Sequence, residues 1–250
     1  MQEPKQPRFS LIIPAHSEEL YLPRLLDTVD EARAFYERGA DAVEVILADN
    51  ASTDATATIA RQRGCRVVSI AERRIASVRN CGAGFARGLF LAFVDADMRI
   101  HVDTFNAIDH SMATGKVVGG ATGVRLERWS LGIAVTYALM VPWVWTLRMD
   151  TGVVFCSSDD FRSIGGYDEL RYFGEDVQLL FDLKGIGRPR GQRLTRLRSA
   201  KALTSMRKFD RYGDWHYFTM LLSLIPAMLR PQETIDERVR DYWYGDGGRQ

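Results

Sequence analysis

The feature that most constrains the fold is an alternation of short apolar runs with stretches of helical periodicity. Residues 9–13, closed by Pro14, form an apolar run rich in β-branched residues, which is typical of a buried parallel strand. Apolar residues then recur at helical spacing from Leu22 up to Gly39, and residues 43–48 are strand-like again. This order predicts a β-α-β unit.

The alternation continues to residue 94. We expect a helix at about 54–63 that ends at Gly64, a strand at 66–70, a helix at about 76–87 and a strand at 89–94. Strands that alternate with helices of this length are typical of a mostly parallel sheet with helices on both faces. The 250 residues, 46% of them hydrophobic and 26% charged, therefore predict an α/β fold.

Composition and motifs exclude several function classes. Lys and Arg number 33 against 32 Asp and Glu, so the basic footprint of a nucleic-acid binder is missing and we expect no nucleic-acid partner. The three cysteines are odd in number and lack metal-ligand spacing, which disfavours disulfides and structural zinc. The first residues contain no apolar signal segment, so we expect a cytoplasmic protein.

Two nucleotide-binding motifs are also unsupported. The sequence contains no GxxxxGK[ST] motif, so nothing indicates a P-loop NTPase. The glycines between Gly82 and Gly88 lie inside an expected helix rather than directly after the first strand, so they do not indicate a Rossmann dehydrogenase.

Polar and acidic residues follow three of the predicted strands. They occupy residues 14–19, 49–54 and 95–97. Ligands of open α/β sheets bind outside the carboxyl ends of the strands, so we expect these segments to converge on one edge and form the site.

The Asp95-Ala96-Asp97 segment has two interpretations. Both carboxylates follow an apolar strand two residues apart, and Mg²⁺ or Mn²⁺ is held by such carboxylates together with substrate phosphate oxygens. The alternative is a solvated strand end. The neighbouring acidic strand ends favour the metal site.

Capping explains some of the other polar residues. We expect Ser52 or Thr53 to cap the helix that follows, with Asp54 in its first turn. Asp49 is not explained in this way, and its carboxylate can accept hydrogen bonds from a base imide or a ribose hydroxyl. Glu18 and Glu19 are either first-turn acids of a helix or ligands.

A glycine turn and an acidic helix start lie further along the chain. Gly165-Gly166 indicates a turn, and Gly174-Glu175-Asp176 opens a helical run. Adjacent carboxylates at that point either complement the helix dipole or supply a general base.

Together, these motifs resemble the inverting glycosyltransferases of family 2, which have the GT-A fold and use nucleotide-diphospho-sugars. The resemblance runs from about Phe9 to Arg211. It is carried by residues 12–19, 49–54, 76–82, 95–97, 164–169 and 175–176, in the order and spacing of the family.

The resemblance implies roles for residues of the donor site. Four residues would line the nucleotide pocket: Pro14, His16, Glu18 and Asp49. Of these, Asp49 would contact the nucleotide base. Arg79 would approach the nucleotide phosphates or the ribose.

The resemblance also implies a metal site and a catalytic general base. Asp95 would face the ribose and the metal, Asp97 would ligate Mg²⁺ or Mn²⁺, and Asp176 would deprotonate the acceptor hydroxyl, with Glu175 as the alternative base. The family often has Asp where Asn50 stands, and a third metal ligand is not identified. His216 is a weak candidate that suits packing or the surface better.

The implied organisation is a GT-A domain over residues 1–215 and a helical extension over residues 216–250. The nucleotide-sugar half would span about 9–100 and the acceptor half about 101–215. The implied reaction is metal-dependent transfer of a sugar to an acceptor hydroxyl with inversion. The alternatives are a sugar-1-phosphate nucleotidylyltransferase, which would carry a Gly-rich, Arg-containing loop after the first strand, and a non-catalytic nucleotide-binding module. A metal-dependent hydrolase is disfavoured because its His-rich ligand set is absent among only four histidines.

Two apolar runs bear on the acceptor and the location. Residues 129–147 and 217–229 carry no charge, whereas Lys184–Lys208 carries nine Lys and Arg and no acid. One interpretation is peripheral contact with the inner face of a membrane and a lipid-linked or cell-envelope glycan as acceptor. The other is a pair of core helices and a solvated basic face.

Overall fold

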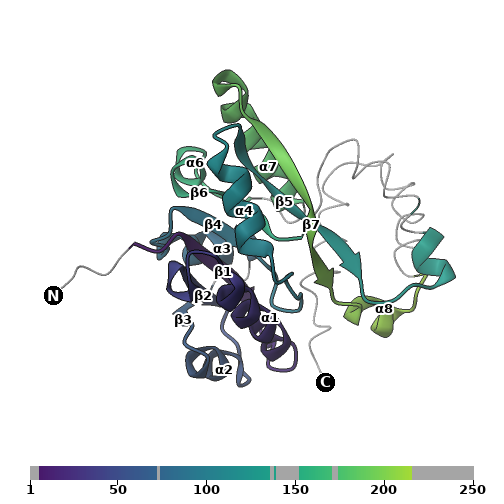
Figure 1. The fold of residues 1–250 in the computed structure, drawn as a ribbon. Helices are drawn as coiled ribbons and strands as arrows, with labels where there is room; N and C mark the ends of the chain where they lie inside the picture. Colours follow the sequence, from purple (N-terminus) through teal and green to yellow (C-terminus); the bar gives the residue numbers. More distant parts are fainter. Residues whose placement is uncertain (1–5, 72–73, 136–137, 139–151, 171–173, 216–250) are drawn as a thin grey trace.

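The computed structural model describes residues 6–71, 74–135, 138, 152–170 and 174–215. His216, the expected extension at 216–250, the run at 217–229 and most of the run at 129–147 lie outside these residues. The fold is a seven-stranded sheet with strand order β3-β2-β1-β4-β6-β5-β7 and helices on both faces (Figure 1).

Strands and helices alternate along the chain as follows. They are β1 (Phe9–Ala15), α1 (Leu22–Phe35), β2 (Val43–Asp49), α2 (Thr56–Gln62), β3 (Arg66–Ser69), α3 (Ile75–Gly84), β4 (Phe90–Phe93), α4 (Thr104–Ala113), β5 (Val117–Leu126), β6 (Val154–Ser157), α6 (Ser158–Ser163), α7 (Glu175–Gly187), β7 (Arg193–Thr204) and α8 (Arg207–Tyr212). Short 3-10 turns cover Ala40–Ala42 and Arg188–Arg190.

The predicted mostly parallel α/β sheet is confirmed. β1 pairs in parallel with β2 and β4, β2 with β3, and β5 with β7, whereas β6 runs antiparallel to β4 and β5. Ala15 at the end of β1 is level with Asp49 at the end of β2. The segments that follow β1 and β2 therefore leave the sheet at one edge, as predicted.

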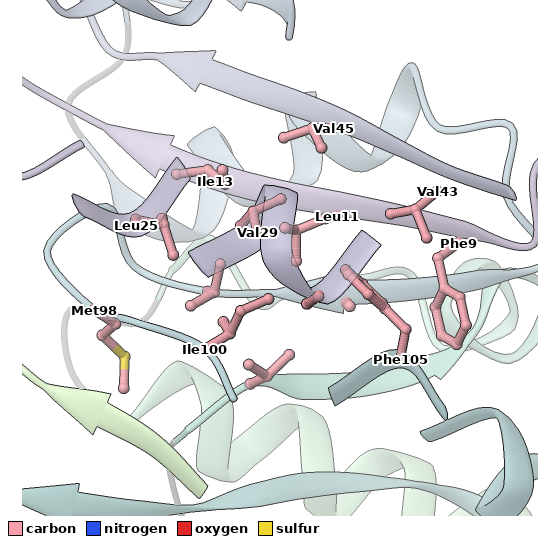
Figure 2. Packing of buried hydrophobic residues seen from close by; sticks show 14 of the residues in the cluster. Phe9, Leu11, Ile13, Leu25, Val29, Val43, Val45, Met98, Ile100 and Phe105 are labelled. Atoms are coloured by element: carbon pink, nitrogen blue, oxygen red, sulfur yellow. The ribbon is translucent and has the colours of Figure 1, made fainter. Parts of the chain in front are cut away.

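Each face of the sheet has its own core. One cluster joins β1 and β2 side chains to α1, α2 and α4, and Figure 2 shows Leu11 and Ile13 of β1 beside Leu25 and Val29 of α1. The other cluster joins the opposite face to α3, α6 and α7. Since apolar burial contributes roughly 25 cal/mol per Å², these clusters fix the strands whose ends carry the polar residues.

β1 is longer than predicted because Pro14 does not end it. The carbonyl of Ile12 accepts from Val94 on the β4 side, whereas that of Ala15 accepts from Asn50 on the β2 side. Pro14 therefore faces the β4 side, where the pairing has already ended at Phe93. Proline lacks an N–H, and at this position no ladder hydrogen bond is lost.

The predicted cap of α2 was wrong. The helix begins at Thr56, and neither Ser52 nor Thr53 caps it. Asp54, which was expected inside the first turn, precedes the helix and accepts hydrogen bonds from the backbone N–H and the hydroxyl of Thr56. Ser52 instead accepts a hydrogen bond from the backbone of Ser17, so it ties the β1 loop to the β2 loop.

A long ribbon of β5 and β7 reaches beyond the rest of the sheet and ends near α8 (Figure 1). Arg99 and Leu203 exchange two backbone hydrogen bonds of 2.9 and 2.7 Å. This bridge holds the end of β7 beside the Asp95–Asp97 segment and brings the start of α8 to the site. Within the described ranges no helix is long and apolar enough to cross a membrane.

Candidate functional site

The loops after β1 and β2 are joined by direct hydrogen bonds. Nδ1 of His16 donates to the backbone oxygen of Asn50 at 2.6 Å. The backbone N–H of Glu18 donates to the Thr56 hydroxyl at 2.8 Å. Ser17 has a φ of 54°, a left-handed conformation that turns this loop sharply. The two loops therefore form one wall of the site.

Pro14 and Asp49 lie at the ends of β1 and β2, where this wall joins the sheet. Asp49 is buried, and its Oδ1 accepts from the backbone of Ser52 at 3.3 Å. Pro14 is a buried residue of β1. The structure thus brings Pro14, His16, Glu18 and Asp49 to one edge, and their contacts with a nucleotide stay predictions.

A buried arginine lies at the centre of the site. Arg79 of α3 is 4% exposed and donates to Asp95 at 2.8 Å, Glu175 at 2.9 Å and Asp176 at 3.2 Å. The family resemblance implies that Arg79 approaches the nucleotide phosphates or the ribose. Its guanidinium is instead bonded to three carboxylates, and any approach to a nucleotide stays a prediction.

Asp176 is held by two donors. The Tyr167 hydroxyl donates to its Oδ1 at 2.9 Å, beside the contact from Arg79. Burial raises the pKa of Asp176 to about 6, although Arg79 and the Tyr167 hydrogen bond act in the opposite direction. A carboxylate with such a pKa can accept a proton near neutral pH.

A second arginine lies on the other side of the Asp95–Asp97 segment. Arg207, the first residue of α8, donates to both carboxylate oxygens of Glu18 at 3.0 and 2.8 Å and lies 3.4 Å from Asp97. It also stacks over Tyr21, 4.9 Å from the ring centre. Burial raises the pKa of Glu18, and the Arg207 charge opposes that shift.

Glu18 and Glu19 are not first-turn acids. α1 begins at Leu22 and has no acidic residue in its first turn. Glu18 binds Arg207, and Glu19 accepts a hydrogen bond from the backbone of Ala55. Both glutamates therefore hold loops of the site together rather than complement a helix dipole.

Sequence reasoning missed Arg207 and Tyr167. Arg207 is 189 residues from Glu18 in the chain, and its only signal was membership of the basic stretch from Lys184 to Lys208. Tyr167 lies in the glycine turn that the sequence marked, but its hydroxyl could be assigned to Asp176 only from the structure.

Asp95 and Asp97 have the chemistry of a magnesium or manganese site. Both offer hard carboxylate oxygens at the end of β4, and their side chains are 46% and 23% exposed. Among the described residues no group of three or more His, Cys, Asp or Glu is arranged to hold a metal. The two aspartates therefore fit an ion that takes its remaining ligands from water and substrate phosphate.

A pocket of about 260 Å³ adjoins Asp97. Its lining includes Tyr21, Arg24, Asp97, Arg99 and Arg207. It lies between the start of α1 and the start of α8, with Asp97 in its lining.

The comparisons with known proteins show the family of the chain. The model of "Glycosyl transferase family 2" matches residues 10–147, which include the β1 loop, the β2 loop and the Asp95–Asp97 segment. The chain belongs to glycosyltransferase family 2. The family predicted from the motifs is therefore confirmed.

Solved structures show the same fold. A mannosyltransferase of Pyrobaculum calidifontis, in complex with GDP-Man and Mn²⁺, superposes with a TM-score of 0.63 at 21% identity, over 82% of this chain and 59% of that one. Glucosyl-3-phosphoglycerate synthase of Mycobacterium tuberculosis, in complex with Mn²⁺, UDP and glucosyl-3-phosphoglycerate, gives 0.59 at 19% identity, over 86% and 78%. TarS residues 1–349 of S. aureus give 0.59 at 17% identity, over 83% and 63%. The predicted GT-A fold is confirmed.

This chain covers a smaller share of its curated relatives than of these solved structures. Validoxylamine A glucosyltransferase of Streptomyces hygroscopicus subsp. limoneus is 25% identical over 73% of this chain and 49% of its own length. The chain therefore spans about half the length of the curated relatives it matches.

Replacing Arg79 tests the buried charge cluster. In Arg79→Met, Asp176, Glu175 and Asp95 lose their shared cation, so the unfolding free energy should fall by about 3–5 kcal/mol at pH 7.5. The loss should be smaller at pH 5, because carboxylates without a cation have higher pKa values and protonate there. Denaturant unfolding at both pH values measures this.

The matched control is Arg87→Met. Arg87 is 61% exposed and bonds Glu44 at 2.9 Å, so its loss should cost no more than about 1 kcal/mol at either pH. Equal destabilisation of Arg79→Met at both pH values would contradict a role of Arg79 in keeping buried carboxylates ionised.

Proposed function

We propose that the protein transfers a sugar, with inversion, from a nucleotide-diphospho-sugar to an acceptor hydroxyl. One observation carries the proposal. The buried Arg79 joins Asp95, just after β4, to Asp176, at the start of α7. The residues proposed for metal binding and for the general base therefore contact one guanidinium. Family membership and the GT-A fold support the same chemistry.

The reaction is a single displacement. Asp176 takes the proton of the acceptor hydroxyl, the acceptor oxygen forms a bond to the anomeric carbon, and the bond from that carbon to the diphosphate oxygen breaks. The bonding electrons leave with the nucleoside diphosphate, so no second acid is needed to protonate the leaving group. Attack from the side opposite the diphosphate inverts the anomeric configuration.

The remaining residues bind and orient the donor. Asp49 contacts the nucleotide base. Pro14, His16 and Glu18 line the nucleotide pocket, which belongs to the nucleotide-sugar half, about residues 9–100. Asp97, with Asp95, holds Mg²⁺ or Mn²⁺, which when bound neutralises charge on the departing diphosphate. The mannosyltransferase was solved in complex with GDP-Man and Mn²⁺, and the glucosyl-3-phosphoglycerate synthase in complex with Mn²⁺ and UDP, which supports this assignment. Residues 101–215 supply Glu175, Asp176 and the acceptor side.

Donor binding tests this function most directly. A ligand that binds only the folded protein raises its apparent stability, so one of the UDP-, GDP- or dTDP-sugars should raise the melting temperature in the presence of Mn²⁺. EDTA or Asp97→Asn should remove most of that shift and lower turnover by about a hundredfold or more. Asp41→Asn, at an exposed carboxylate remote from Asp97 in the chain, is the control and should behave as wild type. A shift that is equal with and without metal contradicts the metal assignment.

The base is tested separately. Asp176→Asn should abolish transfer and leave donor binding within about twofold, because the base acts on the acceptor. In the wild type, burial raises the pKa of Asp176 to about 6, so the carboxylate is protonated below that pH and ionised above it. Turnover should therefore rise with pH through about 6. Calorimetric donor titration and a pH series of turnover measure both. If Asp176→Asn is active and Glu175→Gln is inactive, the base is Glu175. If the wild-type protein binds the donor and shows no turnover under any condition, it is a non-catalytic nucleotide-binding module.

We further propose a lipid-linked or cell-envelope glycan as acceptor, with peripheral contact at the inner face of a membrane. The support is the basic stretch Lys184–Lys208, of which Arg188, Arg193, Arg198 and Lys201 are exposed. Arginine and lysine side chains near a surface attract anionic headgroups, by about 1 kcal/mol each.

Flotation with vesicles tests the membrane contact. The protein should float with anionic vesicles and not with neutral ones, and Arg188→Gln with Arg198→Gln should weaken flotation several-fold. The double variant Arg61→Gln and Arg162→Gln removes two exposed arginines outside the basic stretch and is the control. No association with either vesicle, together with efficient transfer to a water-soluble acceptor, overturns this proposal.

A further inference from the structure

A tyrosine of the glycine turn is built into the site as firmly as the predicted base. Tyr167 is 2% exposed, and its ring packs against Phe93 of β4 and Phe161 of α6, with ring centres 5.1 and 5.9 Å apart. Its ring also lies 5.2 Å from the Arg79 guanidinium. These contacts pack the phenol ring on several sides.

The backbone of Tyr167 is fixed as well. Asn80 of α3 accepts a hydrogen bond from the Tyr167 N–H at 2.9 Å and donates one to the Tyr167 carbonyl at 2.9 Å. Gly166, with a φ of 79°, makes this approach possible, since a Cβ there would lie 2.7 Å from the Asn80 side chain. The same helix, α3, therefore carries Arg79 and anchors Tyr167.

Both donors reach the same oxygen of Asp176. The Tyr167 hydroxyl and Arg79 each contact Oδ1, at 2.9 and 3.2 Å. Within the part of the chain that the structure describes, Oδ2 receives no hydrogen bond, and the side chain is 17% exposed. One oxygen of the carboxylate is thus held by two donors, and the other has none.

We propose that Tyr167 is a positioning residue that anchors Oδ1 of Asp176, so that Oδ2 is the atom that receives the acceptor proton. This proposal rests on the proposed function, in which Asp176 is the base. A general base must point one lone pair at the hydroxyl it deprotonates, and a carboxylate free to rotate would do so only part of the time. Tyr167 itself touches no substrate and acts through Asp176.

Four groups set the charge around Asp176. Arg79 of α3 is the cation. Glu175 precedes Asp176 on α7, and Asp95 follows the end of β4. Tyr167 donates a hydrogen bond to Asp176 from the turn. The phenol hydrogen bond favours the ionised carboxylate, so its removal shifts the titration of Asp176 to higher pH.

Tyr167→Phe tests the proposal, because it removes one oxygen and keeps the ring. Turnover should fall roughly tenfold to a hundredfold, the size expected when a hydrogen bond to a charged group is lost, with donor affinity within about twofold. The pH at which turnover reaches half its maximum should rise by about half a unit or more. Carboxyl-carbon NMR of Asp176 should show the same upward shift without any turnover.

The matched control is Tyr36→Phe. Tyr36 is 4% exposed and donates to the buried Asp109 at 2.7 Å, in the opposite core and away from the site. It should lose a comparable amount of stability and keep the wild-type turnover and pH profile. If Tyr36→Phe reproduces the kinetic loss, or if Tyr167→Phe leaves turnover and the Asp176 titration unchanged, the positioning role is wrong.

The NMR titration separates this inference from the proposed function. An unchanged Asp176 titration in Tyr167→Phe overturns the role of Tyr167 even where transfer is robust. Full transfer by Asp176→Asn overturns the base assignment, and with it the meaning of the anchor.

Discussion

The geometry of the site depends on one buried guanidinium. Arg79 is 4% exposed, and three carboxylates from two distant segments contact it. Without that cation, the mostly buried carboxylates of Glu175 and Asp176 would repel each other and Asp95, which would disfavour the position of the start of α7 beside the end of β4. Since α3 also holds the turn that carries Tyr167, a single helix fixes Asp176 relative to the Asp95–Asp97 segment.

Much of the sheet edge at which β1, β2 and β4 end was predictable, because parallel strands place their carboxyl ends together. The apolar runs located β1, β2 and β4, and the polar residues that follow them do lie at one edge. Element ends were less predictable. Pro14 looks like a strand end, but it continues β1 because the partner strand has already stopped on that side. Ser52 looks like a helix cap, but its hydroxyl is used by the loop after β1. In both cases a neighbouring segment decides the outcome.

The contacts that complete the site join residues far apart in the chain. Glu18 and Arg207 are 189 residues apart, and Arg79 and Asp176 are 97 residues apart. Periodicity describes one element at a time and carries no information on such pairs. The resemblance to the family supplied roles for Asp97 and Asp176, but the family motifs did not include Arg207 or connect the hydroxyl of Tyr167 to the base.

The two arginines differ in a way that divides the site into a rigid and an adjustable part. Arg79 is buried, so its ion pairs are weakly screened and its movement would leave buried charges unpaired. Arg207 has a 36% exposed side chain, lies at the start of a six-residue helix and is screened by solvent. Under the proposed function, the side that holds Asp176 is therefore formed before any substrate arrives. Under the proposed function, the side that holds Glu18 and Asp97 would meet the charged diphosphate. Its cation Arg207, 3.4 Å from Asp97, can move there at a smaller cost than Arg79, because it is screened by solvent.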